Sequence, residues 1–159
     1  MCIRDSTRTS RALKLRSLHD THALWAGSSL RAEYRYYWDT WDIKAHTLEF
    51  GLSKYVAERW LVDASLRSYS QGAALFYSDN ATSETLYVSR NRQLSSFKNT
   101  SVSARLTYTW PGLPAGLDVK IAGSYEFKRF SFEDFTDVRT GAPYSHNAHV
   151  LQATVSATF

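Results

Sequence analysis

The sequence predicts an all-β fold, an antiparallel up-and-down transmembrane β-barrel fragment in which about seven long strands form a curved open sheet. Three observations favour this class: repeated alternation of apolar and polar residues, long alternating segments, and connections that differ in length. Alternation with period two is typical of strands with one apolar and one wet face. Strands of globular proteins average about 5–6 residues, whereas a tilted membrane-spanning strand needs about 9–11.

The clearest alternation runs from Leu117 to Lys128, where apolar residues occupy every second position and polar residues most of the positions between them. The same pattern predicts seven strands, at residues 10–17, 27–38, 42–56, 60–72, 96–110, 116–130 and 147–159. The connections at 57–59 and 111–115 are short, whereas those at 73–95 and 131–146 are long and polar. Short turns at one rim and longer loops at the other are typical of outer-membrane barrels.

Aromatic residues gather near the ends of the predicted strands, and aliphatic residues lie between them. We predict one belt at the long-loop ends and a second at the short-turn ends, as at the two membrane–water interfaces. The first belt contains Tyr36, Trp38, Trp41, Phe97, Tyr125 and Phe127, and the second contains Trp60, Tyr108, Trp110 and Phe159. The alternative is a soluble β-sandwich or a small ligand-binding barrel whose apolar face is its core.

Composition excludes several classes of protein. The chain has 159 residues, enough for one domain, and 14% of them are aromatic, which excludes disorder. No segment approaches the roughly 18 apolar residues of a membrane-spanning helix. A net charge of +4 gives no support for nucleic-acid binding by itself, so we predict no nucleic-acid partner. The single cysteine, Cys2, excludes a disulfide framework and a cysteine-based metal site.

The N-terminal segment has no apolar core of a secretory signal. Its first six residues, Met-Cys-Ile-Arg-Asp-Ser, resemble translated sequencing-adapter sequence. We therefore predict that residues 1–10 form a disordered, artefactual tail and that residues 11–159 are the C-terminal part of an outer-membrane β-barrel. An odd number of strands supports the same expectation, because complete single-chain bacterial barrels have an even number.

Several stretches carry a resemblance to known proteins. The alternating residues Leu151, Ala153, Val155, Ala157 and Phe159 resemble the C-terminal assembly signal of bacterial outer-membrane proteins. The stretches 34–47 and 59–79 resemble a family of proteobacterial outer-membrane proteins catalogued only as a domain of unknown function, over roughly residues 25–159. The resemblance implies a place in the bacterial outer membrane, with lipid and the barrel-assembly machinery as partners, but no activity.

No catalytic, cofactor-binding or metal-binding motif is present in the sequence. His146 and His149 lie three residues apart, which places them on opposite faces of a strand. We therefore predict no cofactor and favour a structural or transport-like role of unknown solute. One alternative is an outer-membrane enzyme with an acid–base site at the outer rim, built from Asp39, Asp42, His46 and Asp79.

The polar face of the predicted sheet carries charges of both signs, which indicates an interior with ion pairs. Three-residue turns at 39–41 and 57–59 would place Arg31 opposite Glu49 and Glu49 opposite Arg67, as an ionic rung across three strands. On the apolar face, Leu106 and Ile121 are expected side by side in the middle of the lipid-facing band.

Overall fold

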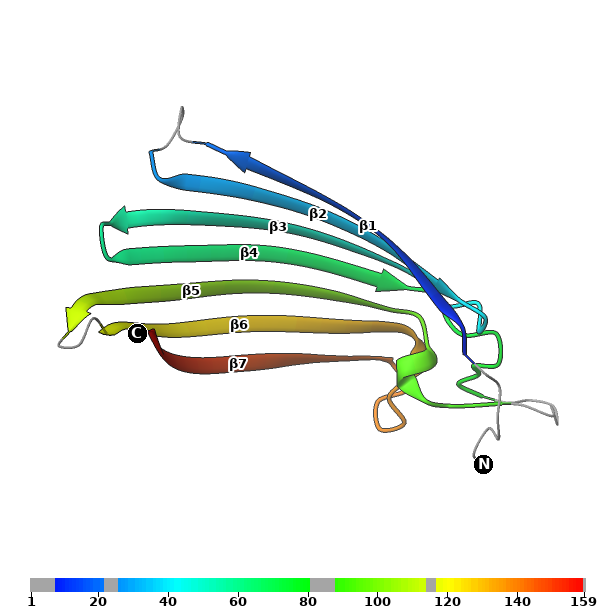
Figure 1. The fold of residues 1–159 in the computed structure, drawn as a ribbon. Helices are drawn as coiled ribbons and strands as arrows, with labels where there is room; N and C mark the ends of the chain where they lie inside the picture. Colours follow the sequence, from blue (N-terminus) through cyan, green and yellow to red (C-terminus); the bar gives the residue numbers. More distant parts are fainter. Residues whose placement is uncertain (1–7, 22–25, 81–87, 114–116, 159) are drawn as a thin grey trace.

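The computed structural model describes residues 8–21, 26–80, 88–113 and 117–158. In these residues seven strands form a single sheet in chain order, and each strand is antiparallel to the next (Figure 1). The strands are β1 (Ser10–Asp20), β2 (Ser28–Asp39), β3 (Lys44–Ala57), β4 (Trp60–Gln71), β5 (Phe97–Leu113), β6 (Leu117–Thr136) and β7 (Pro143–Thr158). The predicted all-β architecture of seven up-and-down strands is thus confirmed.

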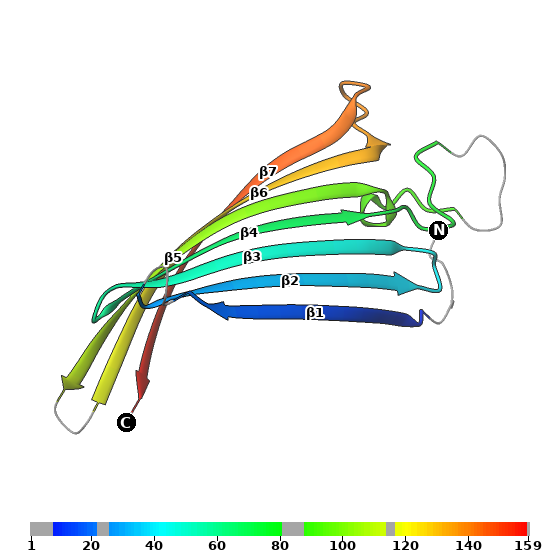
Figure 2. The same ribbon diagram turned by 90° about the horizontal axis from the view of Figure 1, so that it is seen from above.

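The sheet is curved and twisted, and it is open (Figures 1 and 2). β1 and β7 form its two edges and do not pair with each other. The turn at 40–42, the turn at 137–142 and residues 72–80 and 88–96 lie at one end of the sheet, here called the loop end. Residues 72–80 and 88–96 are together called the segment 72–96. The turn at 58–59 and the C-terminal end of β7 lie at the other end, here called the turn end.

The hairpin of β6 and β7 is longer than the sequence predicts. β6 continues to Thr136 and β7 begins at Pro143, so most of the predicted loop 131–146 is paired strand. Aromatic rings from the two strands stabilise this extension: Phe130 and His146 stack at 4.6 Å, and Phe132 and Tyr144 lie 5.6 Å apart. The long-loop assignment is therefore wrong for this connection.

The predicted register between β2 and β3 is wrong by two residues. Arg31 lies opposite Gly51, and Glu33 lies opposite Glu49. The reason is the position of the turn. Asp42 adopts a left-handed conformation, with φ 61°, so the three-residue turn is Thr40-Trp41-Asp42 instead of 39–41.

The register between β3 and β4 agrees with the prediction, since Glu49 lies opposite Arg67. Between β5 and β6 the prediction is again wrong by two residues, because Leu106 lies opposite Gly123 and Ile121 lies opposite Tyr108. β5 continues to Leu113, past its predicted end at residue 110, and its pairing with β6 has an irregularity between Trp110 and Leu113. Pro111 falls inside it, and a proline has no N–H to donate to the ladder.

Few apolar side chains are buried in the described residues. They are Ile43, Ala45, Ala74, Ala122 and Phe132. Directly opposed residues share a face of the sheet, so the registers place a continuous set of large apolar side chains on one face. Its members include Leu15, Tyr34, Leu48, Phe50, Leu66, Val102, Leu106, Ile121, Leu151 and Val155, which are between 37% and 80% exposed. No second layer of described structure covers this apolar face.

The described part of the predicted tail contacts the first hairpin. Nη2 of Arg8 lies 2.7 Å from Oδ2 of Asp39, and its guanidinium lies over the ring of Trp41. Thr9 exchanges backbone and side-chain hydrogen bonds with Thr40. Residues 1–7 lie outside the described part of the chain.

Candidate functional site: the polar face of the sheet

The polar face is concave and carries a central trough of about 440 Å³, which crosses the sheet from β1 to β7. Small side chains make its floor, because serines and a glycine recur where the strands cross the middle of the sheet. The polar-face residues that line it are Leu18, Ser29, Arg31, Gly51, Ser53, Asp63, Ser65, Ser103, Arg105, Ser124, Glu126, Val150 and Gln152. A concave face with small and charged side chains can hold water and polar solutes.

Ion pairs balance the like charges that the register brings together. Glu33 and Glu49 lie opposite each other, which is an unfavourable arrangement by itself. Glu33 instead contacts Lys14 at 2.6 Å and Arg16 at 2.8 Å, both from β1. Glu49 contacts Arg31 at 2.5 Å. Each carboxylate is therefore paired with a cation, although the register differs from the predicted one.

Gly51 makes the diagonal contact of Arg31 with Glu49 possible. A Cβ atom at position 51 would lie 3.4 Å from Nε and Nη2 of Arg31, so the guanidinium occupies the space that a side chain would take. Among the described ion pairs, none joins Glu49 to Arg67, although these two residues are directly opposed. The predicted opposition of Arg31 and Glu49 is thus wrong, and the two side chains instead form an ion pair by a diagonal contact.

A second cavity lies on the same face at the loop end, and we call it the loop-end pocket. It has a volume of about 430 Å³ and is lined by Gln71, Arg92, Gln93, Phe97, Phe130, Phe132 and His146. The rings of Phe130 and His146 are nearly parallel, at 7°. Nδ1 of His146 is buried without a hydrogen-bond partner, so this imidazole serves as an aromatic wall.

The segment 72–96 forms one side of the loop-end pocket and contacts two other parts of the loop end. The backbone N–H of Leu75 donates to the carbonyl of Trp41, and the hydroxyl of Tyr77 donates to the carbonyl of Asp134. The short 3₁₀ helix η1 (Arg92–Leu94) then carries Arg92 to the pocket. The segment therefore joins the β2–β3 turn to the end of β6.

Asp79 anchors this segment to β6. Its carboxylate accepts a 3.0 Å hydrogen bond from the backbone N–H of Thr136 and contacts Nε of Arg90 at 3.0 Å. The hydrogen bond from Thr136 lowers the pKa of Asp79 most; desolvation opposes this effect, and the bond from Arg90 adds to it. The ionised carboxylate is thus the form that holds the segment in place.

The rim residues proposed for acid–base chemistry do not form a single site. Both oxygens of Asp39 are used by Arg8, Tyr37 and the backbone of the turn. Asp42 pairs with Lys44 at 2.9 Å. Nδ1 of His46 lies 2.8 Å from the hydroxyl of Tyr34, on the apolar face. In the described ranges, no group of three or more His, Cys, Asp or Glu side chains could hold a metal ion.

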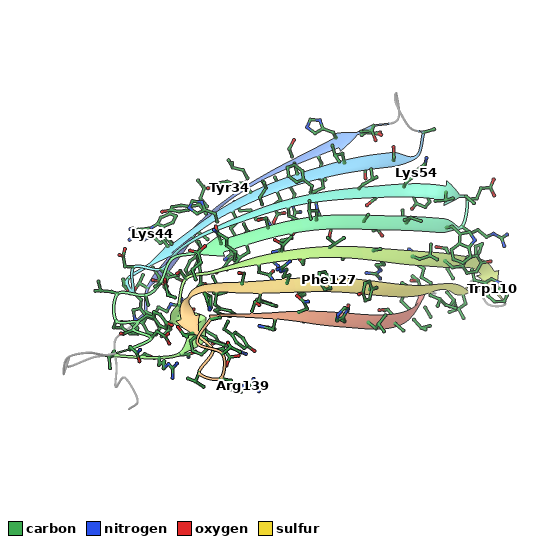
Figure 3. The ribbon with its side chains drawn as sticks, turned by 180° about the vertical axis from the view of Figure 1, so that it is seen from behind. Tyr34, Lys44, Lys54, Trp110, Phe127 and Arg139 are labelled. Carbon is green, nitrogen blue, oxygen red and sulfur yellow. The ribbon has the colours of Figure 1, made fainter. Side chains whose placement is uncertain are left out.

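Most residues of the two predicted aromatic belts lie on the apolar face, but Phe97 does not. It lies opposite Gln71 and Phe132, on the polar face, where it lines the loop-end pocket. Figure 3 shows Trp110 at the turn end of the sheet and Arg139 at the loop end. His146 and His149 lie on opposite faces, as predicted, since they are opposed to Phe130 and Phe127.

The residues of the predicted assembly signal lie on the exposed edge strand β7. Leu151, Ala153 and Val155 are opposed to Tyr125, Gly123 and Ile121 of β6 and therefore share the apolar face. Leu151 is 80% exposed and Val155 is 70% exposed. Phe159, the last residue of the signal, lies outside the described residues.

The loop-end pocket was missed by the sequence-based reasoning. The alternation that places Lys120 and Lys128 on the polar face of β6 also places Phe130 and Phe132 there. The predicted strand, residues 116–130, ends at Phe130. Extending it by two residues would have added Phe132 and shown two phenylalanines on an otherwise polar face. That Arg92 lines the same pocket depends on how the segment 72–96 folds back, and the alternation contains no signal for that.

The protein is thus a single open antiparallel sheet with one charged face and one apolar face. The profile of the family described as "Protein of unknown function (DUF3570)" matches residues 3–119. This match covers more than half of the 159 residues, so the chain belongs to that family. The comparisons with curated proteins and with solved structures found no match. The predicted membership in a family of unknown function is confirmed.

Proposed function

We propose that this protein is a bacterial outer-membrane β-barrel protein with a structural or transport-like role. The apolar face would contact lipid, and the concave polar face would line the interior. The observation that carries the proposal is the apolar face itself, a continuous surface of large side chains that no described element covers. Soluble monomers rarely expose contiguous apolar patches of more than a few hundred Å².

Strand length and side-chain chemistry support the same assignment. The strands contain 11 to 20 residues, as many as or more than the roughly 9–11 that cross a bilayer as a tilted strand. Alternation of outward apolar and inward polar residues is the pattern of such barrels. Among the described residues, no helix has the length and apolar character needed to cross a bilayer.

The two edge strands of the sheet, β1 and β7, have backbone groups that need hydrogen-bond partners in a membrane. β1 and β7 each present one row of backbone N–H and C=O groups that no neighbouring strand pairs. Such groups are costly in lipid, so strands that pair with the two edges would stabilise the sheet in the membrane. The barrel-assembly machinery, acting on the alternating residues of β7, is the partner that we propose for this step.

Labelling of adjacent positions tests the assignment of the two faces. In a Cys2→Ser background, Leu106→Cys and Thr107→Cys each receive an environment-sensitive fluorophore, and the chain is folded into vesicles that contain lipids brominated in the acyl chain. Leu106 lies on the apolar face and Thr107 on the polar face. We expect strong quenching at position 106 and weak quenching at position 107. Equal quenching, or a protein that stays in the aqueous fraction without detergent, would contradict the proposal.

A further inference from the structure

We propose that the loop-end pocket binds a small planar organic anion, a flat ring that carries a carboxylate or a similar group. The pocket is formed by Gln71 of β4, Arg92 and Gln93 of the segment 72–96, Phe97 of β5, Phe130 and Phe132 of β6, and His146 of β7. Its volume of about 430 Å³ lies within the range of small-molecule sites.

The aromatic side chains give the pocket flat walls. Phe97 lies 5.1 Å from Phe132 and 6.3 Å from Phe130, and Phe130 stacks on His146 at 4.6 Å. Phe97 and Phe130 are only half-buried, so part of each ring borders the cavity. Aromatic rings attract another ring in offset-stacked or edge-to-face arrangements. The walls therefore favour a planar ligand.

The amide of Gln71, which lines the pocket between the strands and the segment 72–96, is occupied within the protein. Nε2 of Gln71 donates to the carbonyls of Gln93 and Ser95 at 2.9 Å, and its Oε1 accepts from the hydroxyl of Tyr69 at 2.6 Å. The amide of Gln71 is thus fully used within the protein. A ligand with many hydroxyl groups would leave most of them unpaired against phenylalanine rings, which is unfavourable.

The charge of the pocket favours an anion. Arg92 is the charged side chain among the described lining residues, and none of them is acidic. Its guanidinium lies 5.6 Å from the centre of the Tyr144 ring, and Nη1 makes a long contact of 3.5 Å with the Tyr144 hydroxyl. Among the described ion pairs, none uses Arg92, so its planar donors remain available for a carboxylate.

The site is independent of membrane insertion, because its lining residues lie on the polar face and in the segment 72–96. The inference therefore goes beyond the proposed function. A negative binding result would leave the lipid-facing assignment in place, and a protein that does not enter membranes could still bind the ligand.

The test compares three probes on the full chain folded in detergent micelles, with far-UV circular dichroism to verify the β-sheet. The probes are benzoate, cyclohexanecarboxylate, which has the charge without the flat ring, and benzyl alcohol, which has the ring without the charge. Affinities are measured by ligand-observed NMR. We expect benzoate to bind most tightly, and loss of the charge-assisted hydrogen bond in Arg92→Gln to weaken it by roughly tenfold or more.

Arg139→Gln is the matched control, because Arg139 is a highly exposed cation at the same end of the sheet and does not line the pocket. Benzoate affinity is expected to stay unchanged in this variant. Phe130→Leu should reduce the preference for benzoate over cyclohexanecarboxylate. Equal binding of all three probes, or equal losses in Arg92→Gln and Arg139→Gln, would overturn the proposal.

Discussion

The two faces of the sheet are stabilised in different ways. On the apolar face, Leu15, Val102 and Ile121 remain 63%, 52% and 46% exposed, and the described chain offers nothing to cover them. On the polar face, carboxylates are paired with cations, and the segment 72–96 packs over an aromatic cluster at the loop end. A globular domain buries its apolar face and leaves its polar face to solvent. Here, in the described residues, the apolar face has contacts only between neighbours within the sheet, and a further segment of the chain packs on the polar face.

This difference indicates which contacts within the chain stabilise the folded state. Of the five buried apolar residues, Ile43, Ala45, Ala74 and Phe132 lie at or near the loop end, close to the turn at 40–42 and the segment 72–96. The buried apolar side chains of the described residues are thus concentrated at the loop end of the sheet. The other apolar side chains depend on what surrounds the sheet, and substitutions on the two faces should respond differently to that surrounding medium.

The largest effect is expected for Phe132→Ala. Phe132 is 5% exposed and contacts the rings of Phe97 and Tyr144, so its removal leaves a cavity in the loop-end cluster. Truncation of a buried phenylalanine costs about 3–5 kcal/mol. Phe50→Ala on the apolar face, where Phe50 is 45% exposed, should cost much less in detergent. Urea unfolding of both variants in the same micelles measures the contrast, and equal losses would contradict it.

The next effect depends on the surrounding medium. In lipid vesicles, Leu106→Arg should lower the free energy of unfolding by about 2–4 kcal/mol, because a charge at the bilayer midplane is costly. Thr107→Arg places the same charge on the polar face and should cost much less. Equilibrium unfolding of the two variants in vesicles measures the difference. If both substitutions cost the same, the two faces do not have the environments that we propose.

The architecture could be predicted from the sequence because alternation reports directly which face each residue occupies. The seven strands and the opposite faces of His146 and His149 follow from period two. The register of Glu49 with Arg67 was predicted from the short connection at 57–59. The family of unknown function was also identified from its residues, although the matched range, 3–119, begins and ends earlier than the predicted 25–159.

Registers across turns could not be predicted because they depend on the conformation of single residues. The left-handed Asp42 shifts β3 by two positions relative to the expected pairing. The pairing of β6 with β5 also differs from the expected one by two positions. Alternation is unchanged by a shift of two residues, so it cannot detect either error. The loop-end pocket was missed for a related reason, since contacts of Asp79 with Thr136 join segments 57 residues apart.

The attachment of the segment 72–96 should weaken in acid. The folded-state pKa of Asp79 lies below the ordinary value of 3.8, so its contribution is fully present above that value and is lost as the pH falls through the folded pKa. The protection factors of amide exchange in the segment 72–96, which correct for the intrinsic exchange rate, should therefore fall below about pH 4. In Asp79→Asn, exchange should be elevated at neutral pH and lose this dependence.

Asp42→Asn is a suitable control for this experiment. Asp42 is an exposed carboxylate at the same end of the sheet, and asparagine also tolerates its left-handed conformation. In Asp42→Asn, the pH dependence of amide exchange in the segment 72–96 should match that of the unmodified chain. If Asp79→Asn behaves like Asp42→Asn, the contact of Asp79 with Thr136 does not hold the segment.

The smallest effect concerns the ion pair of the central trough. Arg31 and Glu49 are partly exposed, so their contact should contribute only about 0.2–1 kcal/mol and should weaken in high salt. A double-mutant cycle with Glu49→Gln and Arg31→Gln should show this coupling, whereas the cycle with Glu49→Gln and Arg67→Gln should show less. The diagonal partner then couples more strongly than the directly opposed one, because Gly51 leaves space for the Arg31 guanidinium. A stronger coupling of Glu49 with Arg67 than with Arg31 would contradict this expectation.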